Sequence, residues 1–336
     1  MARMKKLVLE DVKKISIQIG EIPKLDDVNN VLINIKACGI CSSDYSRIYE
    51  KGAYKYPLIL GHEFSGVVKD IYRNIKNIKK GDRVAVFPLK PCFKCDNCHQ
   101  KLYAQCSSYG YYGSREDGGL QEFLAVPEWN IISIDNIPYD IAALIEPASV
   151  ALHAIKKVNI ENHDKILILG SGIIGILTGL LLREMGINNF YYVVRNHNKN
   201  EILRLFNFQS IDYSYKNNDF NIVFECVGSN ESLENSIKFL KTKSTLVLVG
   251  NPESDMLIKR DVYWKILRME LNIIGIWNSY FPCEWQEVVK IMKLLNYSCL
   301  REMIQIVQDF NELLSTIDQK YQKKNLKLKI MWVNNE

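Results

Sequence analysis

The chain has 336 residues, and its 43 lysines and arginines against 38 aspartates and glutamates give a formal net charge of +5. This excess is small and scattered, so nucleic acid is not expected as a partner. A chain of this length is too long for a domain with one typical hydrophobic core, which predicts two domains. The N-terminal stretch lacks the apolar core of a secretory signal. No run approaches the roughly eighteen apolar residues of a membrane span. We therefore expect a cytoplasmic protein without a membrane partner.

The first chemical motif is a loop with four cysteines, "PCFKCDNCHQKLYAQC", at residues 91–106. Thiols stay reduced in the cytoplasm, so this density of cysteines indicates a metal site rather than a disulfide framework. The ligands are spaced Cys92-x2-Cys95-x2-Cys98-x7-Cys106. A loop of this kind presents four thiolates to one Zn²⁺ at about 2.3 Å and leaves no open position, which predicts a structural role. His99 is an alternative ligand, but we expect it to face solvent.

A second group of metal-binding side chains is dispersed along the chain. "KACGICSSDYSRIY" supplies Cys41, "GHEFSGVV" supplies His62 and Glu63, and "IEPASVALHA" supplies Glu146. A cysteine, a histidine and one carboxylate would leave the fourth position of a zinc ion open, as in a catalytic site. From the residues alone, a cysteine of the core and a surface His-Glu pair remain the alternative interpretation.

A dinucleotide-binding segment begins at Lys165 with "KILILGSGIIGILTGLLLREMG". An apolar strand leads directly into a Gly-x-Gly-x-x-Gly turn and an apolar helix, the order in which a pyrophosphate meets a helix N-terminus. Later apolar segments at residues 190–194, 220–228, 244–250 and 271–277 predict a doubly wound parallel sheet. The residues predicted to contact the cofactor lie in this glycine-rich turn and at the ends of later strands. In the turn they are Gly170, Gly172, Ile173, Ile174 and Gly175, and at the strand ends Cys226, Val227 and Gly250.

The position expected for the acid that binds the adenosine ribose reads "VVRNHNKN", and no carboxylate occurs between residues 190 and 200. Arg195, with Lys199 assisting, stands where a cation pairs with a 2′-phosphate, which favours NADP(H) over NAD(H). The alternative is that Arg195 stacks on adenine or faces water.

With these motifs in this order, the chain resembles the zinc-dependent medium-chain dehydrogenase/reductase superfamily over nearly its whole length. The resemblance is carried by "GHEFSGVV", the four-cysteine loop, the Glu-Pro pair and the glycine fingerprint. It implies an α/β protein with a GroES-like β-barrel catalytic domain and a doubly wound Rossmann domain. The catalytic domain would comprise residues 1–147 and 279–336, with the structural zinc loop at 91–107, and the Rossmann domain residues 148–278.

The resemblance also implies roles for individual residues. The catalytic zinc would be held by Cys41, His62 and Glu146, with Glu63 as a ligand or as the group that exchanges with water. Ser43 matches the hydroxyl of the family's proton relay. Asp44 matches the acid that orients the zinc histidine. Two zinc ions per chain are therefore expected.

Within the superfamily the chain looks most like the polyol-phosphate dehydrogenases, through "CSSDYSRIYEKGAYKYPLILGHEFSG", "YGSREDGGLQEFLAV" and "WKILRMELNIIGIW". This predicts hydride transfer between a nicotinamide cofactor and a polyol phosphate or ketose phosphate, with Arg47 and Arg115 as candidate phosphate ligands. The alternatives are an unphosphorylated polyol, a threonine-type substrate, or a zinc- and nucleotide-binding sensor without catalysis. A homodimer or homotetramer is expected, with "LNIIGIW" as a candidate edge.

Overall fold

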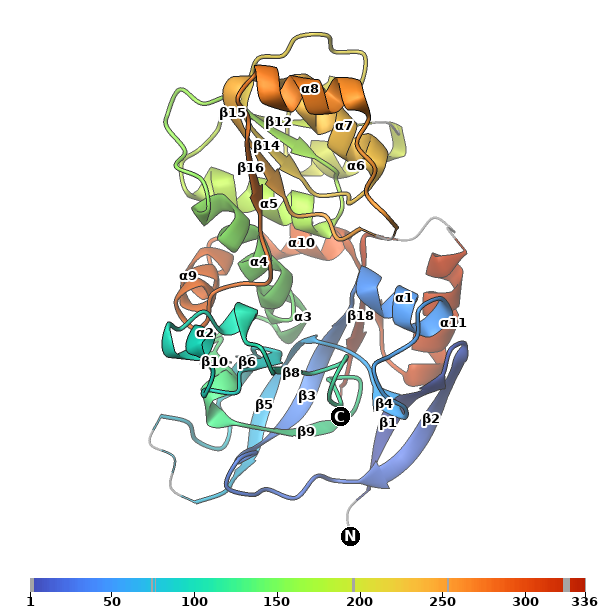
Figure 1. Ribbon diagram of the computed structural model, residues 1–336. Coiled ribbons are helices and arrows are strands. Elements are labelled where there is room, and N and C mark those ends of the chain that lie inside the picture. Colours follow the sequence, from blue (N-terminus) through green and yellow to red (C-terminus); the bar gives the residue numbers. More distant parts are fainter. Residues whose placement is uncertain are drawn as a thin grey trace. The chain divides into compact units, whose positions relative to one another are not determined.

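The computed structural model describes residues 3–73, 75, 77–194, 197–252, 254–322 and 327–335, without the side chains of 197–200. The chain divides into two compact units (Figure 1). Unit 1 comprises residues 1–146 and 280–336, and unit 2 comprises residues 147–279. Within the described residues, no helix is both long enough and apolar enough to cross a bilayer.

Unit 1 is built mainly from β-sheet. Its largest sheet has seven strands in the order β10-β6-β5-β3-β18-β17, with β9 also paired to β3. A three-stranded sheet has the order β2-β1-β4, and β7 pairs with β8. The strands are β1 (Arg3–Asp11), β2 (Lys14–Glu21), β3 (Val31–Ile40), β4 (Leu58–Ile59), β5 (Glu63–Ile71), β6 (Arg83–Val86), β7 (Leu89–Lys90), β8 (Gly110–Tyr111), β9 (Phe123–Val126), β10 (Ile131–Ser133), β17 (Ile304–Val307) and β18 (Lys329–Val333).

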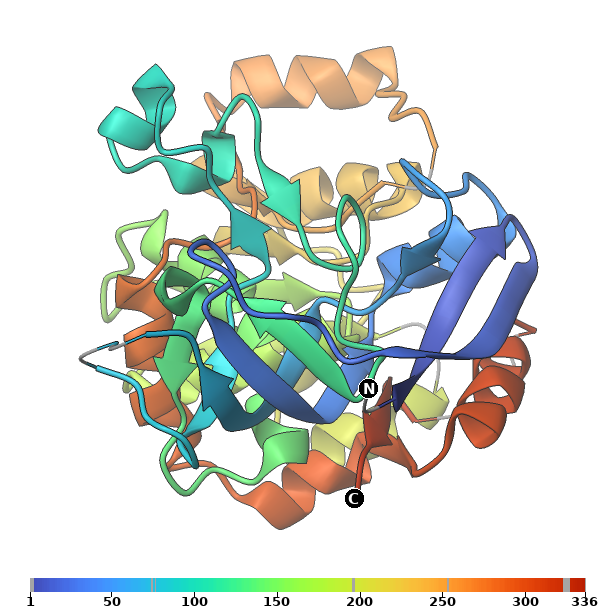
Figure 2. The ribbon, with the colours of Figure 1, turned by 90° about the horizontal axis from the view of Figure 1, so that it is seen from below.

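The helices associated with unit 1 are short. They are α1 (Ser42–Tyr49), α2 (Asp96–His99), η1 (Tyr103–Gln105), η2 (Glu128–Asn130), α3 (Tyr139–Ala142), α9 (Cys283–Met292), α10 (Tyr297–Glu302) and α11 (Phe310–Tyr321). Helix α4 (Ile145–Lys156) begins in unit 1 and continues into unit 2. Figures 1 and 2 show α11 beside α1 and the β1–β2 ribbon, and Phe310, Leu313 and Ile317 belong to the same buried cluster as Leu7 and Leu9.

The centre of unit 1 is β3, because its apolar sequence "VLINIKACGI" is buried almost throughout. Its C-terminal half pairs antiparallel with β5 on one side and with β18 on the other. In this register Gly39 lies opposite Glu63, while Ile40 lies opposite Ile330. The last strand of the chain therefore reaches the place where the metal-binding motifs of the first 63 residues meet.

Unit 2 is a parallel six-stranded sheet in the order β13-β12-β11-β14-β15-β16, the order of a doubly wound dinucleotide-binding fold. Side chains of α7 and α8 pack with Leu167 and Leu169 on one face of β11. Helix α5 packs on the other face, where Tyr192 donates its hydroxyl to the carbonyl of Gly175 at 2.9 Å. The elements are β11 (Ile166–Leu169), α5 (Ile173–Glu184), β12 (Phe190–Val194), α6 (His197–Leu205), β13 (Ser210–Asp212), β14 (Phe220–Glu225), α7 (Asn230–Phe239), β15 (Leu240–Leu248), α8 (Arg260–Arg268) and β16 (Asn272–Gly275). The α/β class and the two-domain architecture expected from the sequence are confirmed.

Candidate active site and zinc sites

The four cysteines of the loop come together as one cluster. One Sγ atom from each of Cys92, Cys95, Cys98 and Cys106 lies within 4.8 Å of the other three. The Cys92–Cys98 and Cys95–Cys106 sulfur pairs are each 3.9 Å apart. A regular tetrahedron with Zn–S bonds of about 2.3 Å has edges of about 3.8 Å, so the donor set and its spacing fit a closed zinc site.

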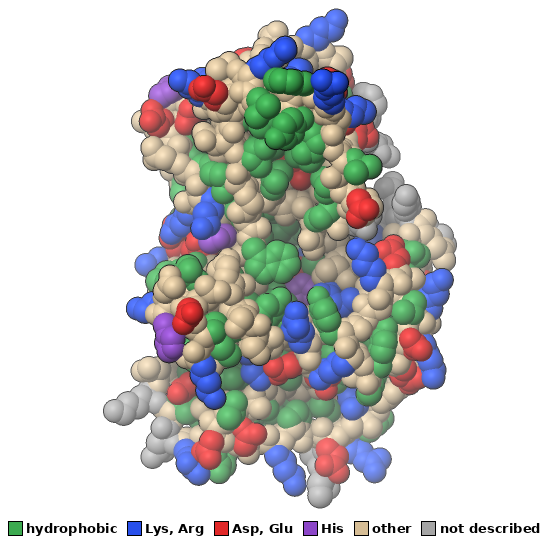
Figure 3. Space-filling view, in the orientation of Figure 1, with side chains coloured by type: hydrophobic (Ala, Val, Ile, Leu, Met, Phe, Trp, Pro, Cys, Tyr) green, Lys and Arg blue, Asp and Glu red, His purple; other side chains and the backbone are tan. Residues whose placement is uncertain are grey.

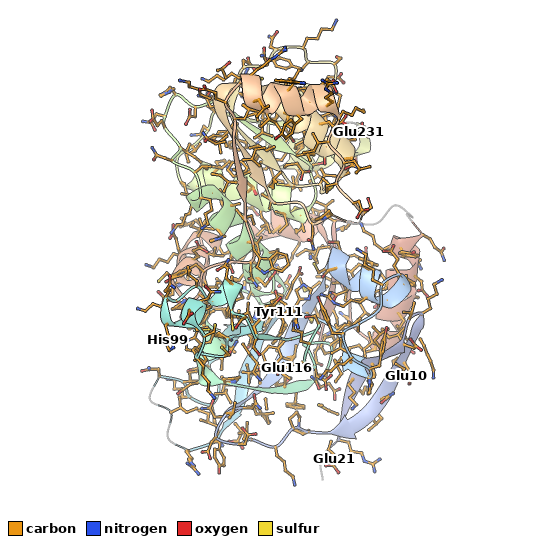
Figure 4. The ribbon with its side chains drawn as sticks, viewed as in Figure 1. Glu10, Glu21, His99, Tyr111, Glu116 and Glu231 are labelled. Carbon is orange, nitrogen blue, oxygen red and sulfur yellow. The ribbon has the colours of Figure 1, made fainter. Side chains whose placement is uncertain are left out.

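Backbone groups of the same loop stabilise thiolates. The N–H of Lys94 donates to Cys92 Sγ at 3.4 Å, and the N–H of Cys92 donates to Cys106 Sγ at 3.3 Å. Backbone hydrogen bonds from Ser107 and Cys98 lower the pKa of Cys95 to about 5. His99 is exposed, and Figure 4 shows it at the outer edge on α2, as the sequence led us to expect.

The second metal group joins Cys41, His62 and Glu63, whose donor atoms lie within 4.8 Å of one another. Cys41 follows β3 and caps α1, while His62 and Glu63 stand at the start of β5. Burial raises the pKa of Cys41, but the neighbouring His62 outweighs it, and the pKa falls below its ordinary value. Sulfur, nitrogen and oxygen donors of this kind suit zinc with one position left for a substrate or water.

Asp44 organises this group from helix α1. Its Oδ2 accepts the backbone N–H of Cys41 at 3.0 Å, and its Oδ1 lies 3.7 Å from His62 Nδ1. Asp44 is fully buried, and His62 Nδ1 is itself buried without a hydrogen-bond partner. A histidine that binds a metal through one ring nitrogen directs the other toward a carboxylate, so this arrangement fits a zinc ligand and its orienting acid.

Glu63 has a partner that sequence reasoning missed. Lys329 donates to both of its carboxylate oxygens, at 2.7 and 2.6 Å, and also to the carbonyl of Ile40 at 3.2 Å. Burial lowers the pKa of Lys329, but the charge of Glu63 outweighs it and raises that pKa above its ordinary value. No local signal marks a lysine in the last strand as part of this site, because only the β3–β18 pairing brings it there.

Glu146 lies outside the three-residue group, although its charge interacts with His62 and Glu63. Burial raises the pKa of Glu146 to about 7, against the opposing effect of His62. The hydroxyl of Tyr111 donates to Glu146 Oε1 at 3.2 Å, and its ring lies edge-on to His62 with centroids 5.8 Å apart. Tyr111, labelled in Figure 4, was missed from the sequence although it follows the four-cysteine loop closely. The expected role of Glu146 as a zinc ligand stays a prediction.

The two arginines expected to bind phosphate have different surroundings. Arg47 Nη1 donates to Ser43 Oγ at 2.8 Å and approaches Asp44 Oδ1 at 3.3 Å. Arg115 is exposed, and its guanidinium carbon lies 4.5 Å from the ring centroid of Tyr54 and 4.6 Å from that of Tyr109.

The glycine fingerprint has the geometry that a dinucleotide requires. Gly170 has φ +112°, and a Cβ there would lie 2.8 Å from the side chain of Val227. A Cβ on Gly175 would lie 1.9 Å from the carbonyl oxygen of Gly170, so helix and strand meet too closely for a side chain. A Cβ on Gly172 would meet nothing within 4 Å, which leaves open space at the start of α5.

Of the remaining residues predicted to contact the cofactor, Ile173 and Ile174 begin α5, and three others lie at the carboxyl ends of β14 and β15. Cys226, Val227 and Gly250 follow these strands, while Arg195 and the side chain of Lys199 lie outside the described residues. Glu225, which sequence reasoning missed, fixes the turn after β14. Its Oε1 accepts the N–H groups of Val227 and Gly228 at 2.8 and 2.9 Å.

Metal ligands in unit 1 and a dinucleotide-binding sheet in unit 2 are the two parts that a zinc-dependent dehydrogenase requires. Residues 27–136 match the family described as "Alcohol dehydrogenase GroES-like domain", and residues 174–294 match "Zinc-binding dehydrogenase". The chain belongs to the zinc-containing medium-chain dehydrogenase/reductase superfamily. It is a zinc-dependent, NAD(P)-dependent polyol or sugar dehydrogenase.

Two dehydrogenases of similar sequence and one crystal structure of similar fold support this assignment. Galactitol 1-phosphate 5-dehydrogenase of Escherichia coli K12 is 31% identical over 306 residues, which are 87% of this chain and 88% of that protein. Sorbitol dehydrogenase 1 of Saccharomyces cerevisiae is 30% identical over 268 residues, 73% of this chain and 75% of that protein. The crystal structure of galactitol-1-phosphate dehydrogenase from Escherichia coli superposes with a TM-score of 0.91 at 27% identity, covering 98% of this chain and 100% of that one.

Proposed function

We propose that the protein interconverts a polyol phosphate and a ketose phosphate, with NADP(H) as the hydride carrier. The relative named for galactitol 1-phosphate acts on a phosphorylated polyol by its name. The observation that carries the proposal for this chain is the environment of Arg115. The named sorbitol dehydrogenase is the reason to keep an unphosphorylated polyol as the second candidate substrate.

Arg115 is arranged as an anion ligand. The guanidinium carbon lies over the rings of Tyr54 and Tyr109, at 4.5 and 4.6 Å from their centroids, and these contacts occupy none of its N–H donors. Among the described residues, no carboxylate or carbonyl accepts a hydrogen bond from this side chain. A planar guanidinium edge matches two phosphate oxygens at once.

The loop that carries Arg115 is connected to the metal site and held in place. The ring of Tyr109, which lies beneath the Arg115 guanidinium carbon, contacts the ring of Tyr111 with centroids 6.3 Å apart. The hydroxyl of Tyr111 in turn donates a hydrogen bond to Glu146. The adjacent Glu116, labelled in Figure 4, accepts from Lys90 Nζ at 2.7 Å. Tyr109 therefore connects Arg115, the proposed phosphate ligand, to Tyr111 at the metal site.

The proposed reaction uses a zinc ion whose ligands are held in place by neighbouring side chains. When bound, zinc on Cys41, His62 and Glu63 supplies Lewis-acid polarisation of the substrate oxygen, and the nicotinamide carries the hydride. Asp44 fixes the imidazole of His62, and Lys329 fixes the carboxylate of Glu63.

Ser43 exchanges a proton with the substrate oxygen. It is half-buried on the first turn of α1, two residues after Cys41. Tyr111 holds Glu146 by a hydrogen bond and meets His62 in an edge-on ring contact. These contacts keep the polar groups of the site in fixed orientations, which is how a protein lowers the reorganisation needed during the reaction.

We further propose NADP(H) as the preferred cofactor. Strand β12 ends at Val194, and the sequence contains no acid between residues 190 and 200 to bind an unphosphorylated ribose. Arg195 is the proposed partner of the 2′-phosphate. The measurement is the ratio of kcat/KM for NADPH over NADH, which Arg195→Ala should lower by at least about tenfold.

A homo-oligomer is proposed through unit 2. Strand β16 is an edge of its sheet, and apolar side chains gather on the face that carries α8 (Figure 3). The exposed large apolar residues of α8 are Tyr263, Trp264 and Leu267, while the exposed Ile273 lies on β16 and Trp277 just after it. A monomer rarely exposes such a patch, and an open strand edge favours pairing. Light scattering on wild-type protein and on Leu267→Asp tests this proposal, with a smaller species expected for the variant.

The substrate proposal is tested with Arg115→Gln. We expect kcat/KM for a phosphorylated polyol to fall roughly 10- to 100-fold, the value of one charge-assisted contact, while that for the free polyol changes less than about twofold. Lys55→Gln, which removes an exposed charge next to Tyr54, is the matched control and should change neither value. An equal loss for both substrates, or no loss, would count against the proposed role of Arg115.

A further inference from the structure

One guanidinium nitrogen of Arg47, Nη1, contacts two side chains of the same helix, α1. Its side chain is 18% exposed, and its Nη1 lies 2.8 Å from Ser43 Oγ, four residues earlier. The same nitrogen lies 3.3 Å from Asp44 Oδ1. Residues four apart on a helix face one another, so α1 itself enforces the Ser43–Arg47 contact.

We propose that Arg47 is a positioning residue that sets the direction of the Ser43 hydroxyl for proton exchange with the substrate. This inference rests on the proposed function, because it takes Ser43 as the proton carrier. It reassigns Arg47, since the sequence suggested a ligand of the substrate phosphate.

The physical reason lies in the hydrogen-bonding capacity of the two groups. A guanidinium has only donors, so in the 2.8 Å contact Ser43 Oγ must be the acceptor. A hydroxyl has one hydrogen and two lone pairs, and Arg47 occupies one of those lone pairs. The hydroxyl hydrogen is turned away from the cation. The hydroxyl hydrogen and the second lone pair of Ser43 are then available for hydrogen bonds to water and to the substrate.

The proton transfer through Ser43 accompanies the transfer of a hydride between the substrate and the nicotinamide. In oxidation, the substrate carbon gives its hydride to the oxidised nicotinamide, and its hydroxyl proton passes to the free lone pair of Ser43. The original hydrogen of Ser43 passes to solvent water, so Ser43 ends the cycle unchanged. Reduction reverses each transfer, with solvent as the proton source.

The contact with Asp44 explains why an arginine suits this position. Asp44 also faces His62 and accepts from the backbone of Cys41, so it is held in place from the other side. Arg47 therefore bridges an acid fixed by the metal-binding segment and the hydroxyl that carries the proton. A lysine would place a compact charge there without the planar fork of donors.

The test is a double-mutant cycle between Arg47 and Ser43 in the zinc-loaded enzyme. The cycle uses whichever polyol, phosphorylated or free, turns over fastest, so that failure of the phosphate proposal does not decide this one. Arg47→Gln alone is also assayed with the other form of that polyol. We expect Arg47→Gln to lower kcat roughly 10- to 100-fold with KM changed less than about threefold. In the Ser43→Ala background the same substitution should lower kcat no further.

Several readouts distinguish positioning from a structural role. Zinc content and thermal unfolding are measured for every variant, and Arg47→Lys replaces Arg47→Gln if the latter fails to fold. In Arg47→Ala, added guanidinium ion should restore part of kcat. Lys51→Gln, an exposed cation just after α1, is the control and should behave as wild type.

Two results would overturn the inference. Multiplicative losses in the double variant would show that Arg47 acts independently of Ser43. A selective loss for the phosphorylated substrate, expected instead for Arg115→Gln, would return Arg47 to the phosphate.

Discussion

Lys329 donates two hydrogen bonds to the carboxylate of Glu63, and both side chains are only 2% exposed. The two residues are 266 positions apart in the chain and lie on the strands that flank β3. A buried carboxylate without this cation would carry an unpaired charge in a low-dielectric environment. The pair therefore links the C-terminal strand to the metal site.

Substituting Lys329 by Met tests this link. After removal of metal by a chelator, leaving Glu63 buried and unpaired should lower the free energy of unfolding by about 3–5 kcal/mol, measured by urea denaturation. The double variant Lys329→Met/Glu63→Gln should recover part of the loss, because neither residue then carries a charge. Lys293→Met breaks an exposed pair with Asp135 and should cost less than about 1 kcal/mol. An equal cost for both lysines would contradict the stated role of Lys329.

The four-cysteine cluster predicts a zinc ion that can be removed separately. Cys95→Ser should lower the zinc content from two ions per chain to one and make residues 91–107 sensitive to protease, because the loop depends on the metal for its fold. Metal analysis and limited proteolysis measure both effects. Cys283 is exposed and belongs to neither metal group, so Cys283→Ser is the control. Unchanged zinc content in Cys95→Ser would refute this assignment.

The Cys41, His62 and Glu63 group predicts the second ion. Cys41→Ala should remove one zinc per chain, leave the loop protected, and lower kcat by at least about a thousandfold because the substrate oxygen loses its Lewis acid. Cys299→Ala, in α10, is expected to keep two zinc ions and normal turnover. Retention of both ions in Cys41→Ala would place the catalytic metal elsewhere.

Glu146 predicts a pH dependence of stability in the metal-free protein. Its pKa in the fold is about 7 against an ordinary value of 4.5, so between these values the folded state binds more protons than the unfolded state. Wild-type stability should then fall as the pH rises from 4.5 to 7, and the loss is complete above 7. Gln at this position does not titrate.

The matching measurement compares Glu146→Gln with wild type after removal of metal by a chelator. Thermal unfolding should show the variant gaining stability relative to wild type between pH 5 and pH 8, by roughly 1–3 kcal/mol. The same difference between the two proteins at both pH values would show that burial does not penalise the Glu146 carboxylate.

Local spacing predicted two parts of the site, whereas the dispersed group of Cys41, His62 and Glu63 was expected from the resemblance to the family. The four cysteines lie within one short loop, and the three glycines lie within six residues between a strand and a helix, so their geometry follows from the local chain. Lys329 and Tyr111 were not predicted. The strand register brings Lys329 to Glu63, and the packing of a loop brings Tyr111 to Glu146. No periodicity in the sequence records these contacts.

The proposed role of Arg47 in positioning Ser43 depends on a contact within one helix. Ser43 and Arg47 are one helical turn apart, and their contact follows once α1 is placed at Ser42–Tyr49. The sequence alone presented Arg47 as one cation among many. The contacts of Arg47 Nη1 with Ser43 and with the buried Asp44 appear only once the helix is placed.

The most direct test of the central proposal is the initial rate of nicotinamide oxidation at 340 nm with zinc-loaded protein. NADPH or NADH would be paired with phosphorylated ketoses, such as fructose 6-phosphate and tagatose 6-phosphate, and with the corresponding free sugars. We expect turnover of a phosphorylated ketose, faster with NADPH, and at least about tenfold slower turnover of its free counterpart. Equal or faster turnover of the free sugar would contradict the polyol-phosphate proposal and favour a sorbitol-type activity.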